Sequence, residues 1–213
     1  SAISRKAFLA GFAAAGLFLA TAAASPARAS DLAEAEELVD DAYHVVNQML
    51  QNNEFEALPR YLENAQGVMI YPALVKGGFI LGGEGGSGLL MVRGSDGSWS
   101  SPAFYTLAAG SIGLQIGGQV SKAVLTIMNE GAVRAMMEDG FKFGGDISVA
   151  VGPVGKGLEA STTGNFDEDV YVFSSAVGLF GGGSLEGAGL IEKNTYNYAY
   201  YDSGQAVPYA IAV

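Results

Sequence analysis

Three glycines, Gly83, Gly85 and Gly88, match the G-x-G-x-x-G pattern of loops that bind the phosphates of a dinucleotide. Such a loop needs a strand before it and a helix directly after it, because the N-terminus of that helix faces the pyrophosphate. Here the following residues, LLMVRGSDGSWS, predict a second strand and a turn, and Glu84 would place a negative charge beside the phosphates. We therefore interpret the glycines as part of a hairpin or bulge in a sheet.

Two further patterns resemble reactive loops, and both are incomplete. GPVGKG at residues 152–157 has Ala150 where a phosphate-binding P-loop needs its first glycine, and Gly157 where a Ser or Thr would hold magnesium. Ser111 has Ala109 where a nucleophile elbow needs glycine. A Gly-Pro turn and an ordinary strand explain these segments better.

Residues that could transfer protons or bind metals are scarce. His44 is the only histidine and there is no cysteine, so neither an acid–base pair nor a zinc site of the usual kind is expected. FDEDV at residues 166–170 lacks the spaced ligands and glycine of a calcium loop, which favours a solvated turn. We expect no catalytic residue, no metal and no cofactor. A hydrolase that uses Ser111 or Ser87 is the enzymatic alternative, and it lacks a base.

Cationic and aromatic side chains offer a binding chemistry instead. Lys76 and Arg93 lie near Phe79 and Trp99 in the sequence. If these side chains gather at one rim, the cations can contact a lipid headgroup while the aromatic rings meet the interface or the acyl chains. The alternative is that each lysine only aids solubility and Trp99 belongs to the core.

The first 29 residues predict an export signal. A basic start at Arg5 and Lys6 precedes an apolar run from Phe8 to about Ala24, and Ala27 and Ala29 form an A-x-A cleavage pattern. We expect cleavage of residues 1–29, a single domain over residues 30–213, and a periplasmic or outer-membrane-associated protein. An uncleaved membrane anchor is the alternative, and the general secretory route is favoured over a twin-arginine route.

Charge excludes one class of partner. Cleavage would remove three basic residues and no acidic one, which takes the net charge from −11 to −14. We therefore expect no nucleic-acid partner, and anionic lipid would be bound only where the few cations cluster.

Periodicity predicts the elements that would position these residues. Apolar residues recur at helical spacing from Asp31 to about Asn52, with Asp31 and Glu34 as a capping box, and a shorter helix is expected near Pro59. After Gly67 the period changes to two, and only one further helix, capped by Asn129, is expected. The prediction is an α+β fold: a curved, mainly antiparallel sheet or small barrel with N-terminal helices and one internal helix.

The ordered series of strand motifs resembles a known family. Lys76 to Phe79, Asp96 to Trp99, Asp146 to Gly155, Gly178 to Gly187 and the closing NYAYY are similar to the SYLF domain, and the resemblance runs from about Asp31 to Asp202. It implies a non-enzymatic, lipid-binding domain, with actin association in some fungal members. An exported chain would not meet actin, so we do not expect that partner.

We therefore expect a lipid- or membrane-binding protein of the cell envelope, with headgroup contacts from Lys76 and Arg93 and apolar contacts from Phe79 and Trp99. The alternative is a structural or protein-interaction module of the periplasm without a lipid ligand. In that case the acidic helix or a tyrosine-rich tail, Tyr196, Tyr198, Tyr200 and Tyr201, would meet an envelope protein.

Overall fold

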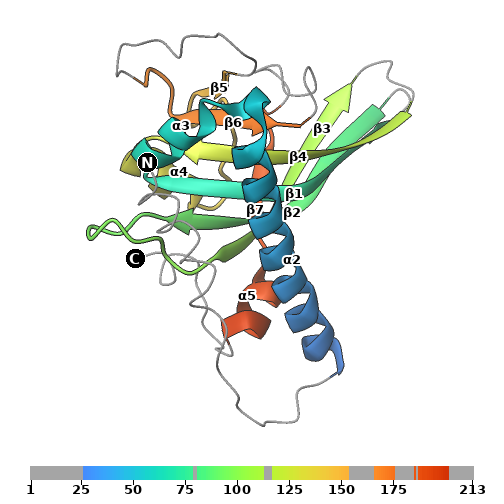
Figure 1. Ribbon diagram of the computed structural model, residues 1–213. Coiled ribbons are helices and arrows are strands. Elements are labelled where there is room, and N and C mark those ends of the chain that lie inside the picture. The colour runs from blue at the N-terminus through green and yellow to red at the C-terminus, as the bar shows by residue number, and fades with distance from the viewer. Residues whose placement is uncertain are drawn as a thin grey trace.

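The computed structural model describes residues 26–78, 81–112, 117–153, 166–175, 185 and 187–201. One twisted, curved sheet carries three helices on one face and a short helix on the other (Figure 1). The α+β class is confirmed.

Seven strands form the sheet, in the spatial order β5-β6-β4-β1-β2-β3-β7. All neighbours are antiparallel except β5 and β6, which are parallel. The sheet is open, with three-residue and four-residue strands at its edges, so the barrel alternative is not realised in the described residues. The strands are β1 (Gly67–Gly78), β2 (Leu81–Val92), β3 (Ala103–Ile112), β4 (Gly117–Ile127), β5 (Val149–Val151), β6 (Val170–Ser174) and β7 (Gly189–Glu192).

The helices occur where the periodicity predicts them, with two differences. Helix α2 (Pro26–Gln51) begins five residues before Asp31, which therefore lies inside the helix and does not cap it. It is followed by a 3-10 turn, η1 (Asn53–Phe55), and by α3 (Leu58–Asn64). The second difference is an unexpected C-terminal helix, α5 (Asn194–Tyr201), which packs along α2.

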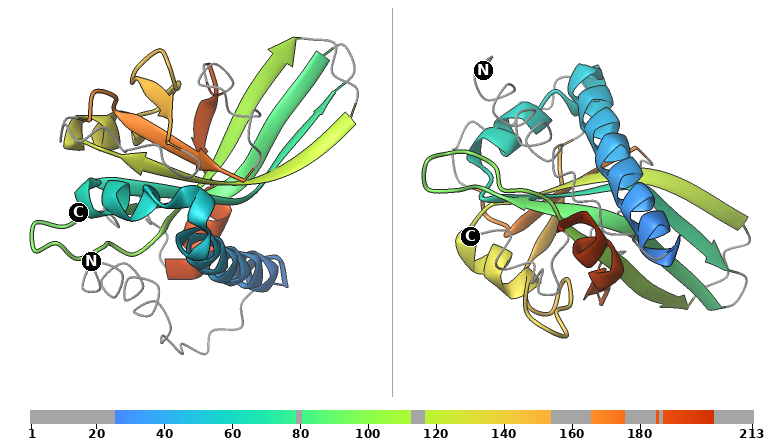
Figure 2. Two further views of the ribbon diagram at one scale, coloured as in Figure 1. Left: turned by 45° about the horizontal axis from the view of Figure 1, so that its top comes forward. Right: turned by 90° about the horizontal axis from the view of Figure 1, so that it is seen from below.

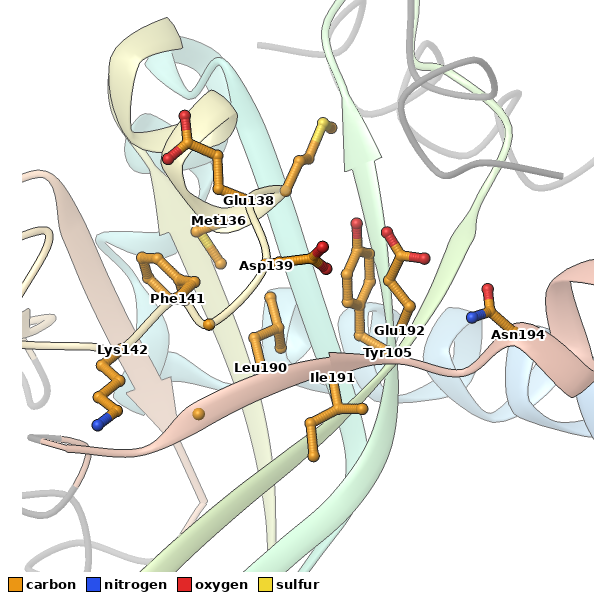
Figure 3. A pocket seen from close by; sticks show the side chains of 13 residues that line it. Tyr105, Met136, Glu138, Asp139, Phe141, Lys142, Leu190, Ile191, Glu192 and Asn194 are labelled. Carbon is orange, nitrogen blue, oxygen red and sulfur yellow. The ribbon is translucent and has the colours of Figure 1, made fainter.

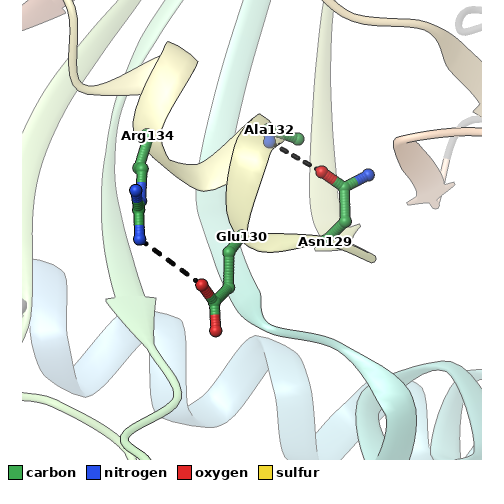
Figure 4. A network of polar contacts seen from close by, with 4 residues as sticks. All are labelled: Asn129, Glu130, Ala132 and Arg134. Carbon is green, nitrogen blue, oxygen red and sulfur yellow. Dashed lines mark hydrogen bonds and ion pairs between the residues drawn. The ribbon is translucent and has the colours of Figure 1, made fainter.

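The internal helix α4 (Glu130–Met136) starts at Asn129 as expected. The side-chain oxygen of Asn129 accepts a hydrogen bond from the backbone N–H of Ala132 at 2.8 Å, which satisfies one of the free donors of the first turn (Figure 4). Arg134 and Glu130 form an ion pair at 3.5 Å, but both side chains are exposed and the pair adds little stability. The cap therefore fixes the start of α4.

The glycines of the G-x-G-x-x-G pattern lie within β2, and one of them, Gly88, packs with the neighbouring Gly86 against an irregularity in β1. The pairing of β1 with β2 shifts register between Ile70 and Val75. A Cβ atom on Gly88 would lie 2.5 Å from a ring carbon of Tyr71, and one on Gly86 would lie 2.2 Å from the carbonyl oxygen of Ala73. Close approach of the two backbones requires glycine here, which confirms that the pattern serves the sheet.

Two apolar clusters cover the two faces of the sheet. One contains the buried faces of α2, α3 and α5 together with Val68, Leu89 and Phe104. The other contains α4 and the aromatic rings of Tyr105, Phe141 and Phe143. Among the described residues, no helix is both long enough and apolar enough to cross a bilayer.

Four strands extend past these clusters. Strand β6 pairs with β4 only from Ala123 to Ile127, and β7 pairs with β3 only from Tyr105 to Ala108. The remaining ends of β1–β4, residues 74–78, 81–86, 109–112 and 117–122, project away from the helices (Figure 2). We call this projection the arm.

Candidate functional site

Arg93 and Trp99 contact each other directly. They form an isolated antiparallel bridge, and the guanidinium carbon of Arg93 lies 4.3 Å from the centre of the Trp99 ring. The guanidinium also donates hydrogen bonds to the carbonyl oxygens of Leu62 at 2.7 Å, Ala65 at 2.8 Å and Gly97 at 3.3 Å. Trp99 is only 8% exposed. These contacts give the pair a structural role: it joins the end of α3 to the turn after β2.

Lys76 lies at the opposite end of the sheet. It is the cross-strand partner of Glu84, and its amino group lies 3.8 Å from a carboxylate oxygen of that residue. Burial raises the pKa of Glu84, and the positive charge of Lys76 opposes this shift. Gly67, which lies beside Arg93, and Lys76 are nine positions apart on β1. This separation corresponds to a distance on the order of 30 Å along the strand. The expected common rim of Lys76, Arg93 and Trp99 is therefore not formed.

Phe79, the fourth residue expected at the rim, lies outside the described residues. A headgroup role for Lys76 and Arg93 stays a prediction. The antiparallel register explains the separation, because Arg93 follows the end of β2 that pairs with the start of β1, whereas Lys76 lies near the end of β1.

Within the described residues, the reactive motifs considered from the sequence occupy structural positions, whereas residues 154–157 of GPVGKG lie outside the described residues. Ser111 lies in β3 and not at a strand-to-helix turn. His44 is exposed on α2 beside the ring of Tyr43. Asp169, from the acidic cluster, accepts hydrogen bonds from the backbone and hydroxyl of Ser148 and from Asn129, and these bonds lower its pKa. The described part of the chain has no group of three or more potential metal ligands.

The tyrosine-rich segment is mostly packed against the protein and is not a free tail. Tyr196 is buried, and its hydroxyl donates a hydrogen bond to Glu34 on α2. Tyr201 donates to the carbonyl of Pro102. The ring of Tyr200 packs edge to face against Phe104. Tyr198, 43% exposed, is the member that faces solvent.

An uncharged row of residues crosses the sheet at the base of the arm, on the face that carries α2. Val120 on β4 pairs with Val75 on β1, and the row continues through paired positions across the sheet. Val75 is 52% exposed and Val120 is 64% exposed, whereas a typical strand valine is buried. We call this row the apolar strip; its members are Val120, Val75, Gly85, Ala108 and Gly189.

Two lysines lie beside the apolar strip on the side nearer the helices. Lys122 lies two residues from Val120 on the same face, and its amino group donates to Gln48 of α2 at 2.7 Å. Lys193 follows β7, donates to the hydroxyl of Ser87 at 2.7 Å, and lies 3.6 Å from the centre of the Tyr196 ring. Burial lowers the pKa of Lys193, while the negative charges of Glu34 and Asp31 oppose that shift.

Sequence inspection alone did not single out the strip. Val75 and Val120 are 45 positions apart, and only the pairing of β1 with β4 brings them together. The signal that could have found them is the glycine-rich alternation of both segments, which places a glycine two positions from each valine on its own face, Gly77 beside Val75 and Gly118 beside Val120.

Comparison with known proteins identifies the family. A family model described as Ysc84, Las17-binding protein actin regulator, matches residues 108–211. SH3 domain-containing YSC84-like protein 1 of Xenopus laevis is 37% identical over 154 residues, which cover 72% of this chain and 46% of that protein. Protein YSC84 of Saccharomyces cerevisiae is 35% identical over 151 residues, covering 68% of this chain and 32% of that protein.

The human SH3 domain-containing YSC84-like protein 1 is 36% identical over 141 residues, covering 66% of this chain and 41% of that protein. The chain thus spans less than half the length of each of these relatives. The family model covers three of the motifs from which the resemblance was drawn: Asp146 to Gly155, Gly178 to Gly187 and the closing NYAYY. The chain belongs to the SYLF family, the family of the Ysc84 proteins.

Proposed function

We propose that this protein binds a lipid membrane surface, without catalysis, through the exposed face of the arm. The observation that carries the proposal is the cross-strand pair Val75 and Val120, both more than half exposed on an uncharged part of the sheet. Moving an exposed valine into hydrocarbon is favourable by roughly 1–1.5 kcal/mol, and cross-strand partners on one face of the sheet can both contact one bilayer.

The bordering lysines favour a surface with some negative charge. Lys122 and Lys193 would lie near the headgroups when the apolar strip meets the acyl boundary, which is where long cationic side chains are stable. The rest of the protein opposes this attraction, because the chain has a net charge of −11 and α2 exposes Glu36, Glu37, Asp40 and Asp41. Apolar contact should therefore contribute most of the affinity, and added salt should change it only modestly.

We further propose that this surface acts in the cell envelope, after export directed by residues 1–29. The basis is the N-terminal sequence pattern alone. Cell fractionation, with N-terminal sequencing of the purified protein, tests this part independently of lipid binding. A protein that starts at Ser30 in the envelope fraction supports it, and a cytoplasmic protein with an intact N-terminus contradicts it.

Vesicle co-sedimentation tests the membrane surface. Wild-type protein should bind vesicles of phosphatidylcholine with phosphatidylglycerol, and V75S/V120S should reduce the affinity about tenfold. Val151 on β5 is 43% exposed, so V151S is the matched control and should bind like wild type. Equal affinity of V75S/V120S and wild type would contradict the proposal.

A protein partner is the second candidate, favoured by the description of the matching family as Las17-binding. The exposed acidic face of α2 is the surface that such a partner would contact. If wild-type protein binds no vesicle, and a stoichiometric partner from envelope extract is lost when Glu37 and Asp40 are changed to Gln and Asn, this function replaces the first.

A further inference from the structure

A pocket of about 340 Å³ opens at the β7 edge of the sheet on the side of α4, and Gly189, the last member of the apolar strip, also lines it. Its walls come from the end of α4, from the segment that follows this helix, and from β7 (Figure 3). Met136, Phe141 and Leu190 supply buried apolar surface, and all three are less than 10% exposed. The volume is at the lower end of the range for small-molecule sites, roughly 300–1,000 Å³.

Tyr105 lies at the inner end of this pocket with its hydroxyl unused. The residue is 1% exposed, and its hydroxyl has no hydrogen-bond partner within the described structure. In Figure 3 the hydroxyl points between the carboxylates of Asp139 and Glu192. A buried hydroxyl without a partner is costly, so an unpaired one that points into a pocket indicates a ligand atom at this position.

The two carboxylates make this end of the pocket negative. Glu192 is the cross-strand partner of Tyr105, and burial, followed by the charge of Asp139, raises its pKa. Neither carboxylate forms an ion pair with any described cation. Lys142 also lines the pocket, but its amino group points away from Tyr105 in Figure 3.

This combination favours an organic cation over a metal ion. The described residues do not bring three metal-ligating side chains together anywhere, and more of the pocket surface is apolar than polar. A primary ammonium can donate one hydrogen bond to each carboxylate and a third to the phenol oxygen, while its alkyl chain lies against Met136 and Leu190. We propose that the pocket binds the primary ammonium group of a small, soluble alkylamine.

The position of the pocket favours a soluble ligand over a lipid headgroup. Val75 and Val120 face the α2 side of the sheet, whereas Tyr105 and Leu190 belong to the cluster on the α4 side. A bilayer that contacts the strip therefore leaves the pocket on the other face. Amine binding and membrane binding should consequently be separable, and V75S/V120S should retain the amine site.

Titration with n-butylamine, followed by NMR spectra of ring-labelled tyrosine, tests the site in the wild-type protein. We expect saturable shifts of the Tyr105 ring and no such shifts with n-butanol, which has the same chain length and no charge. E192Q and Y105F should each weaken butylamine binding at least tenfold. Glu138 lines the same pocket but points away from Tyr105 in Figure 3, so E138Q is the matched control and should bind like wild type.

Three results would overturn the proposal: equal shifts with butanol, equal weakening by E138Q and E192Q, or no saturable binding of butylamine. Vesicles that contain phosphatidylethanolamine, compared with phosphatidylcholine vesicles, identify the alternative source of the ammonium group. The protein could bind phosphatidylethanolamine vesicles, lose this binding in E192Q, and fail to bind butylamine. That result would show that the pocket binds the lipid headgroup and would contradict a soluble ligand.

Discussion

The guanidinium of Arg93 lies over the ring of Trp99 while it donates to the carbonyl oxygens of Leu62 and Ala65. A planar group with donors in a fixed fork can make these contacts together, and the ammonium of lysine cannot. R93K should therefore lower the free energy of unfolding by about 1–3 kcal/mol in urea denaturation, because buried acceptors at the end of α3 lose their donors.

R93K also tests the headgroup role expected from the sequence. If Arg93 acts only in the fold, R93K should bind vesicles with wild-type affinity at temperatures where it is folded. A variant of unchanged stability with weakened vesicle binding would restore the headgroup role and contradict the structural one.

Replacement of Tyr105 by phenylalanine should raise the stability of the protein, whereas R93K should lower it. Because its hydroxyl has no partner in the described structure, Y105F should stabilise the ligand-free protein by about 1 kcal/mol. Tyr71 is the matched control, since it is equally buried but its hydroxyl donates to the sulfur of Met69, so Y71F should not stabilise the protein. Urea denaturation of the three proteins measures the difference. Destabilisation by Y105F would show that the hydroxyl has a partner.

The bulge between β1 and β2 predicts which glycines can be replaced. G88A would place a methyl group 2.5 Å from a Tyr71 ring carbon and 2.6 Å from the carbonyl oxygen of Ile70, and should cost about 3 kcal/mol. A Cβ atom on Gly110 would have no atom of another residue within 4 Å, so G110A should change the free energy of unfolding by no more than about 0.5 kcal/mol. Similar thermal unfolding of G88A and G110A would contradict the close approach.

The contact between α2 and α5 predicts a dependence on acidic pH. The hydrogen bond from Tyr196 is the largest of the effects that lower the pKa of Glu34 below its ordinary value of 4.5. A carboxyl group with a lowered folded-state pKa stabilises the fold above pH 4.5, and this contribution is lost as the pH falls through the folded-state pKa. Y196F should therefore unfold at a lower temperature than wild type at pH 7, and the difference should narrow at pH 3. A difference that is constant with pH would assign the effect of Y196F to packing alone.

Local sequence patterns predicted most elements of the fold. The change from helical to two-residue period at Gly67, the cap at Asn129 and the glycine pattern in β2 are properties of neighbouring residues, and each is found in the structure. Helix α5 was missed because Asn and Tyr have modest helix propensity. Its conformation is stabilised by contacts with α2 and Phe104, which are distant in sequence.

The candidate sites depend even more on distant contacts. Arg93 and Trp99, six residues apart, lie together, but Lys76 does not join them as the expected rim required. Two of the three carbonyl groups that accept from the guanidinium lie about 30 positions earlier in the sequence. Tyr105, Asp139 and Glu192 come from three separate segments, and no local pattern relates them. Strand register and burial, which bring such residues together, are set by the whole sheet.

The packing of α2 against α5 joins the first and last described elements of the chain. The apolar residues of α2 that α5 covers therefore have no final partner until α5, which begins more than 140 residues after the end of α2, has been synthesised. Strand β1 likewise cannot pair with β4 until β4, whose residues follow it by about 50 positions, has been synthesised. Contacts between elements this far apart in the sequence form slowly, on the millisecond-to-second scale typical of sheet proteins. Docking of α5 on α2 is therefore a late step of folding.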